Sequence, residues 1–552
     1  MAIETAKQRY QKRLSALRNE RSSWEPHWRE LADYFLPRKG RWLFNNVNRG
    51  DKRNQLLIDS EPRLAARTLA SGMMAGLTSP ARPWFRLITP DPEMMEFGPV
   101  KQWLYDVERR MRDVFAKSNL YKPLPTVYGE MGVFGVCPMI GLEDPRSLIR
   151  FFPLTIGSYY LAQNEQHRVD TLYREVNMTV RQMVRMFGEK ACSPTVRSMW
   201  QNGSTEQWIR VIHISEPNED RVITRADNRN MPFRSAWFEA GDGNGDGFLR
   251  QSGFNEFPVM APRWDPTAED VYSGSPGMDA LGDAKALQYQ QKQKAKAIDK
   301  HVDPPMQAPT SLRNERASLL PGDITYVDVA SGMQGFVPAY QIKPEIQALL
   351  LDMQEMRDRI NRTFYVDLFL MLAMSDRRQM TATEVAERHE EKLLMLGPVL
   401  ERLNDELLDP LIDRTFSVMF RAGALPPPPP ELEGVDLKVE YISILAQAQR
   451  MVGLGAVDRL YQFAGAVAGA DPTVLDKLDH DQAVDEYADM LGVPPGIVRP
   501  DDAVARLRQQ RAQAQAVAAA AQAAPGLSKA AKDLAETPVD GDSALSRALG
   551  GV

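Results

Sequence analysis

The sequence predicts an α+β protein that is mainly helical. Three observations lead to this fold class: apolar residues recur at spacings of three and four through most of the chain, short β-branched and aromatic runs gather in one central region, and no apolar run is long enough to cross a bilayer. The 552 residues, 43% hydrophobic and 25% charged, are enough for several packed domains.

The amino-terminal region predicts helices on either side of a basic segment. Two helical pieces are expected in the first 36 residues, where apolar side chains recur at helical spacings: Leu14, Leu17, Trp24, Trp28, Leu31 and Phe35. A further helix is expected over Glu61–Leu77, because the prolines of TSPARPW cannot continue it. Between them, Pro37–Arg53 is either a solvated loop or a contact for nucleic acid or a partner protein.

A central region predicts β structure. From Phe151 to about Pro262 the runs TLYREV, QWIRVIHIS and DRVITR indicate an antiparallel sheet inserted among helices. The stretch GDGNGDG then matches the first half of an EF-hand loop that would start at Asp242, but Gly253 stands where the bidentate glutamate is required. A glycine-rich hairpin loop is therefore expected instead of a calcium site.

Two further helices flank a short segment with strand character. Asp279–Asp303 predicts a long helix that stops at Pro304, and the middle of this helix is almost wholly polar. The second helix, Lys343–Phe364, carries an apolar stripe that needs a partner helix: Ile346, Leu349, Met353, Met356 and Ile360. The two helices predict a protruding hairpin whose polar faces meet either water or neighbouring copies.

The carboxy-terminal third predicts one very long helix and several short ones. The long helix starts at the capping residue Thr381 and runs to Arg421, which is about 60 Å at ~1.5 Å per residue. Leucine periodicity resumes after Pro398 and after Pro410, so these prolines should kink the helix without ending it. A polyproline linker follows, then short helices and an alanine-rich helix over Asp501–Ala524.

The charge and the cysteines restrict the function classes. Residues 1–60 carry 13 Lys and Arg against 7 Asp and Glu, so this region is +6 while the remainder is −12. A net charge of −6 argues against a protein that coats nucleic acid through a broad basic surface. Two cysteines in a chain of this length give no disulfide framework, which fits synthesis in a reducing compartment.

Few residues point to an enzyme. There is no GxxxxGK[ST] phosphate loop, no CxxC pair and no H-E-x-x-H motif, and the six histidines are scattered. Cys137, on an apolar run, is expected to be a buried small hydrophobe and not a nucleophile. Neither a cofactor nor a metal is predicted. Two interpretations stay open from the residues alone: a metal-dependent DNA-processing enzyme, with Asp367 and Asp376 as candidate ligands, and a coiled-coil scaffold.

Four stretches carry a resemblance to a known family. They are SSWEPHWRELADYFLPRKGRW, LIDSEPRLAARTLASGMMAGLTSPARPWFRL, YSGSPGMDALGDAKALQ and MTATEVAERHEEK, and they occur in the family's order. Together they resemble the head-to-tail connecting (portal) proteins of short-tailed, T7-like bacteriophages. The resemblance covers nearly the whole chain, from about Arg9 to the alanine-rich helix.

The resemblance implies a non-enzymatic, ring-forming protein of twelve subunits at one capsid vertex, through which DNA is packaged and later ejected. It also implies a portal-like fold with these parts: a wing (1–275), a first stem helix (276–302), a clip (303–342), a second stem helix (343–366), a tunnel loop (367–380), a long wing helix (381–425), a crown (426–524) and a flexible tail (525–552).

Site residues and partners follow from the same resemblance. The tunnel loop near the DNA would hold Met371, Met374, Ser375, Asp376, Arg377, Arg378 and Gln379. Channel or inter-subunit residues of the stem would be Lys285, Lys292, Lys294, Lys296 and Lys300, and clip residues that contact a motor or adaptor would be Arg313, Asn314, Glu315 and Arg316. Arg377 and Arg378 could equally form inter-subunit salt bridges or a solvated turn.

The expected partners are further copies of the chain, double-stranded DNA, a terminase packaging motor, a tail adaptor, major capsid and scaffolding proteins, and internal core or ejection proteins. The expected place is the virion, after synthesis in the host cytoplasm.

Overall fold

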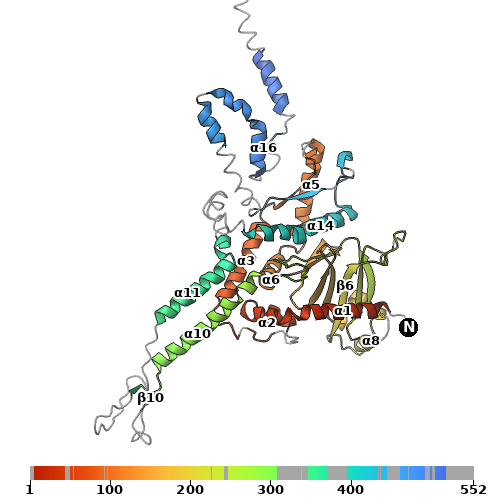
Figure 1. Ribbon diagram of the computed structural model, residues 1–552. Coiled ribbons are helices and arrows are strands. Elements are labelled where there is room, and N and C mark those ends of the chain that lie inside the picture. Colours follow the sequence, from red (N-terminus) through yellow and green to blue (C-terminus); the bar gives the residue numbers. More distant parts are fainter. Residues whose placement is uncertain are drawn as a thin grey trace, which may run out of the picture. The chain divides into compact units, whose positions relative to one another are not determined.

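The structure is a computed structural model (Figure 1). It describes residues 5–43, 50–53, 55–91, 94–95, 97–225, 227–241, 247–307, 337–338, 346–370, 395–432, 434–435, 437–443, 445, 460–469, 471–490, 498–499 and 504–516. The chain divides into two compact units, Met1–Gly455 and Ala456–Val552.

The main core of the first unit is built from helices. Their bounds are α1 Ala6–Ser22, α2 Glu25–Tyr34, α3 Glu61–Leu77, α5 Gly98–Lys117 and α6 Leu124–Phe134. The two amino-terminal helices and the helix over Glu61–Leu77 are thereby confirmed. Trp28, Leu31 and Phe35 of the second piece are fully buried in this core, because the apolar face of α2 turns inward.

A five-stranded antiparallel sheet confirms the predicted β insertion. Its strand order is β4 (Tyr159–Gln163), β5 (Val169–Thr179), β6 (Trp208–Pro217), β7 (Phe233–Glu239) and β8 (Arg250–Phe254). Leu14 and Leu17 of α1 cover one face, beside Tyr173 and Phe238. Helices α7 (Val180–Phe187) and α8 (Pro194–Gln201) cover part of the other face.

One expected strand of this region is absent, and the expected glycine-rich hairpin connects two strands of the sheet. The run DRVITR is not a strand, and Ile223 is 86% exposed. Asn230 holds this stretch in turns, because its side chain accepts from the Val222 backbone N–H at 2.7 Å and donates to the Arg225 carbonyl at 2.6 Å. The glycine-rich stretch joins β7 to β8 and so forms the predicted hairpin, although residues 242–246 lie outside the described residues.

The remaining strands form small sheets. A three-stranded sheet has the order β3 (Leu148–Pro153), β2 (Met139–Asp144) and β9 (Val259–Met260), and β1 (Phe85–Ile88) pairs with β12 (Lys438–Tyr441). The sequence predicted short helices over β12, which is wrong. Because β12 pairs with β1, this stretch after the polyproline run belongs to the first unit.

The long helix changes its winding before its second proline. Residues 395–403 are helical and run through Pro398, a π-helical turn spans Asn404–Leu408, and α14 spans Asp409–Arg421. Pro410 follows the π turn directly. A proline ring would meet the carbonyl four residues earlier in a regular α-helix, so the wider turn accommodates it. The part before 395 lies outside the described residues.

The second unit consists of short helices where it is described. These are residues 460–469, α16 (His480–Met490) and residues 504–516, with a 3₁₀ turn at Pro472–Lys477. The last helix confirms the described part of the predicted alanine-rich helix. Its Arg508 forms an ion pair with Asp481.

Candidate functional site

Helices α10 (Leu281–Val302) and α11 (Ile346–Thr363) lie side by side and form the predicted hairpin (Figure 1). At the base of the hairpin, Leu287, Met353 and Ile360 are fully buried in the main core, where α3 contacts α11. The apolar stripe of α11 therefore finds its partners in α10 and α3. This end of the hairpin is an integral part of the first unit.

A polar network fixes the hairpin base to the segment before α3. The Gln288 amide accepts from the backbone N–H groups of Ile58 and Asp59, both at 2.7 Å, and donates to the Asp59 carbonyl at 2.9 Å. Arg357 of α11 donates to the Asp59 carboxylate at 2.7 Å. Since one buried aspartate holds both helices, their orientation at the base is well determined.

The distal half of the hairpin has almost no cover. Beyond Gln288, no described residue of α10 is buried, and Tyr289 is 64% and Val302 77% exposed. On α11, Leu351 is 73% exposed. At the far end, Met306–Gln307 pairs with Val337–Pro338 in a two-stranded sheet. Large apolar side chains exposed along a two-helix arm indicate a surface that another chain covers.

One predicted stem lysine is already paired within the chain. Lys285 Nζ lies 2.5 Å from the Glu30 carboxylate of α2 and 6.0 Å from the centre of the Tyr34 ring. This lysine therefore ties α10 to α2.

The other four stem lysines lie beyond the hairpin base and form no ion pair with any described residue. Successive helix residues turn by about 100°, so Lys292, Lys296 and Lys300 fall within about 80° of one another. Lys294 falls on the opposite side of the helix. Tyr289 shares the sector of the three aligned lysines, which gives this face both charge and apolar area.

The predicted tunnel-loop residues 371–379 and the predicted clip residues 313–316 lie outside the described residues. The residues on either side of the undescribed segment 371–394 are described. Phe369 is 1% exposed and sits against Gly72 of α3, where an added Cβ would come within 2.2 Å of the ring. Leu396, one residue after the description resumes at Met395, is also 1% exposed.

The candidate chemical groups can be located only where the structure describes them. Among the described residues, no three His, Cys, Asp or Glu side chains gather as metal ligands. Asp376 lies outside the described residues, so the pair with Asp367 cannot be measured. Cys137 is fully buried, as predicted, and burial raises the pKa of its thiol well above the ordinary value. A thiol held neutral in this way is a poor nucleophile.

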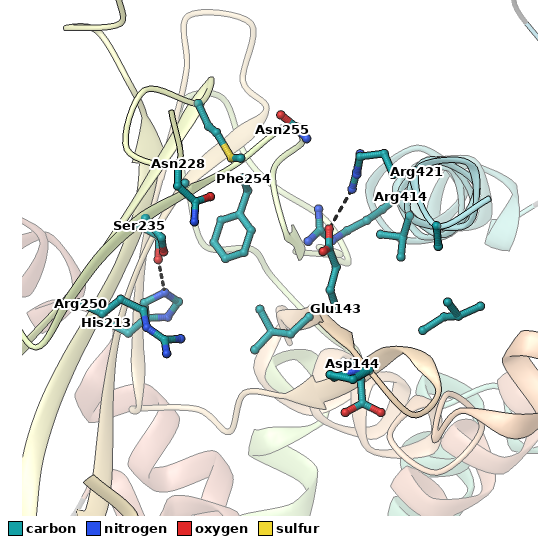
Figure 2. Close-up of a pocket in the computed structure, with 18 of the residues that line it drawn as sticks. Glu143, Asp144, His213, Asn228, Ser235, Arg250, Phe254, Asn255, Arg414 and Arg421 are labelled. Carbon is teal, nitrogen blue, oxygen red and sulfur yellow. Dashed lines mark hydrogen bonds and ion pairs between the residues drawn. The ribbon is translucent and has the colours of Figure 1, made fainter. Parts of the chain in front are cut away.

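A polar row across the sheet was missed by the sequence analysis. Arg174 Nε donates to His213 Nδ1 at 2.9 Å, and His213 Nε2 lies 3.0 Å from Ser235 Oγ (Figure 2). Burial, and then Arg174, lower the pKa of His213 well below its ordinary value, so the ring is neutral and its proton is on Nε2. Nε2 is therefore a donor and cannot deprotonate the serine, unlike the histidine of a Ser–His–Asp triad. The one sequence feature that could have indicated this row is His213, a polar residue within the strand-like run QWIRVIHIS.

In the part of the chain that the structure describes, no helix is both long and apolar enough to span a membrane.

Comparisons with known proteins find relatives along nearly the whole chain. The family model described as "Bacteriophage head to tail connecting protein" matches residues 7–498. The portal protein of Salmonella phage epsilon15 is 51% identical over 98% of both chains. The probable portal protein of Bordetella phage BPP-1 is 49% identical over 96% of both chains.

Among solved structures, the neck of an empty gene transfer agent particle is 12% identical, with a TM-score of 0.34, over 79% of this chain and 89% of the other. That likeness is too weak to support a statement about the chain.

The match over residues 7–498 and the two portal relatives over nearly the whole chain define a structural head-to-tail connector. The chain belongs to the bacteriophage head-to-tail connecting, or portal, protein family.

Proposed function

We propose that copies of this chain form a closed ring in which the α10–α11 hairpins stand side by side around a channel for double-stranded DNA. The observation that carries this proposal is the exposed distal half of the hairpin, with Tyr289 at 64% and Leu351 at 73% exposure. When each copy contacts the next through two different faces and the series closes into a ring, this surface is covered in every copy. Twelve subunits are the number that the family resemblance implies.

The two flanks of the hairpin are complementary. One sector of α10 carries Tyr289, Lys292 and Lys296, and at about 100° per residue one sector of α11 carries Leu351, Glu355 and Asp358. All of these residues are exposed. The α10 face of one copy meets the α11 face of the next, so that the tyrosine and the leucine are covered and lysines lie opposite carboxylates. Lys294, on the other side of α10, lies outside this contact.

The ring occupies one vertex of the virion capsid. Its clip, residues 303–342 with Arg313 and Arg316, contacts the terminase packaging motor and later the tail adaptor. The wing meets the major capsid and scaffolding proteins, and the crown meets internal core or ejection proteins. The chain is made in the host cytoplasm and assembles there.

Arg377 and Arg378 contact passing DNA from the tunnel loop. One or two arginines per subunit, within a protein of net charge −6, touch phosphates without arresting the DNA, whereas many fixed contacts would multiply around the ring. Alanine at both positions should leave the rings intact and change packaging or DNA retention. Unchanged packaging would remove their DNA role.

Charge reversal tests the hairpin contact. Lys292→Glu with Lys296→Glu should prevent rings, because like charges then face each other, and adding Glu355→Lys with Asp358→Lys should restore them. Lys294→Glu is the matched control and should leave the rings unchanged. Particle mass in solution is the readout. Rings that persist in the Lys292 and Lys296 double variant would rule out this contact.

A further inference from the structure

A cavity of about 760 Å³ lies between the five-stranded sheet, the end of the β2–β3 hairpin and α14 (Figure 2). Its lining combines charged, polar and apolar side chains, including Ser235, Trp237, Arg250, Phe254, Arg414 and Arg421. The connector function assigns nothing to it.

Behind the cavity wall lies a buried cation that pairs with no carboxylate among the described residues. Arg174 is 8% exposed, and burial lowers its pKa to about 10. Its Nε–H holds His213 Nδ1 as an acceptor, so His213 Nε2 donates to Ser235 Oγ. The Ser235 hydroxyl proton must then point to another acceptor. Because Ser235 lines the cavity, this chain of hydrogen bonds from Arg174 leaves the Ser235 hydroxyl as a donor at the cavity wall.

A second buried cation lines the cavity from α14. Arg414 is 2% exposed, and its Nε donates to the Gly141 carbonyl at 2.9 Å. Its Nη1 lies 3.3 Å from the Glu256 carboxylate, which Arg421 shares at 2.5 Å. Its buried Nη2 has no hydrogen-bond partner among the described residues. Buried charges are normally paired, so this guanidinium is incompletely satisfied.

Both acidic side chains of the lining already have partners. Glu143 is largely exposed and pairs with Arg421 at 2.9 Å. Asp144 accepts from the Ser147 hydroxyl at 2.7 Å, and this hydrogen bond lowers the pKa of the carboxyl. Neither group pairs with Arg174 or Arg250, so these two cations have no carboxylate partner among the described residues.

We propose that this cavity binds a short acidic segment of a partner protein, with one carboxylate received by Ser235 and Arg250 on the sheet wall, a second received by Arg414 on the α14 wall, and apolar side chains against the remaining wall. The volume is far larger than one small anion needs. Leu148, Met231, Phe254 and Val418 also line it, and a free ion would leave them uncovered. A carboxylate flanked by apolar side chains satisfies both parts of the lining. The proposal does not depend on ring formation.

The test uses the full chain and a fluorescent peptide, Leu-Glu-Phe-Glu-Leu, with Leu-Gln-Phe-Gln-Leu as its uncharged counterpart, and measures anisotropy. The acidic peptide should bind at least about tenfold more tightly, since charge-assisted hydrogen bonds are roughly twice as strong as neutral ones. Arg250→Gln and Ser235→Ala should each weaken binding by about tenfold.

The matched control is Arg210→Gln. Arg210 is an exposed arginine of β6 on the opposite face of the sheet, and this change should leave the affinity unchanged. Circular dichroism checks the fold of each variant. Arg250 is exposed, so its substitution decides the matter even if Ser235→Ala perturbs the sheet. Equal binding of the two peptides, binding unaffected by Arg250→Gln, or displacement by an equal concentration of inorganic phosphate would overturn the proposal.

Discussion

Truncation of the exposed leucine of α11 should weaken ring assembly. Fully burying a leucine side chain stabilises by about 2 kcal/mol, and Leu351 has 73% of its surface available to a neighbour. Leu351→Ala should therefore cost about 1 kcal/mol at each subunit contact, roughly a fivefold weaker association. Leu351→Asp should cost more, because an aspartate would then lose its hydration.

The assay is particle mass over a dilution series, which gives the concentration at which rings dissociate. Leu350→Ala is the matched control: Leu350 is 43% exposed and lies about 100° away on the same helix, outside the proposed contact sector. Its dissociation concentration should stay close to that of the unaltered protein. If Leu351→Asp forms rings at the same concentrations as the unaltered chain, the assignment of the α11 face to the subunit contact is wrong.

Three further predictions concern stability and are read by urea denaturation. Glu406→Ala should lower the free energy of unfolding by about 3–5 kcal/mol, because Arg263, 5% exposed and with its Nε 2.9 Å from Glu406 Oε1, would be buried without its carboxylate and would keep only neutral acceptors. An unchanged midpoint would contradict this. Gly135→Ala should cost at least ~2 kcal/mol, since φ is +88° and a Cβ would come within 2.0 Å of the Ser273 carbonyl oxygen; a loss below ~0.5 kcal/mol would show that the turn can relax. Burial raises the pKa of Glu108 to about 7, so between about pH 4.5 and 7 the folded state holds a proton that the unfolded state releases. The free energy of unfolding should therefore fall as pH rises through this range. Glu108→Gln should flatten that fall, and a variant with the same pH profile as the unaltered protein would contradict the prediction.

Local sequence signals were enough for several elements. The helix Glu61–Leu77 was predicted with the bounds that the structure shows, because prolines follow its end. The hairpin of α10 and α11 followed from an apolar stripe beside a polar one. In both cases the residues that set the boundaries lie within a few positions of the boundary itself.

Tertiary contacts explain the elements that were missed. β12 has no strand signal strong enough to stand alone and forms because β1 offers an edge more than 300 residues earlier in the chain, with Phe85 opposite Tyr441. The row from Arg174 to Ser235 depends on the register of three strands, which no local pattern encodes. The turn that replaces the expected strand DRVITR depends on one asparagine side chain, Asn230.

The most direct test of the ring is electron microscopy of the purified protein, with particle mass measured in the same buffer. Closed rings with a central hole, at about a dozen chains, are the predicted result. Extended open particles, or a compact monomer or dimer at every concentration, would contradict a ring closed by the α10–α11 hairpins.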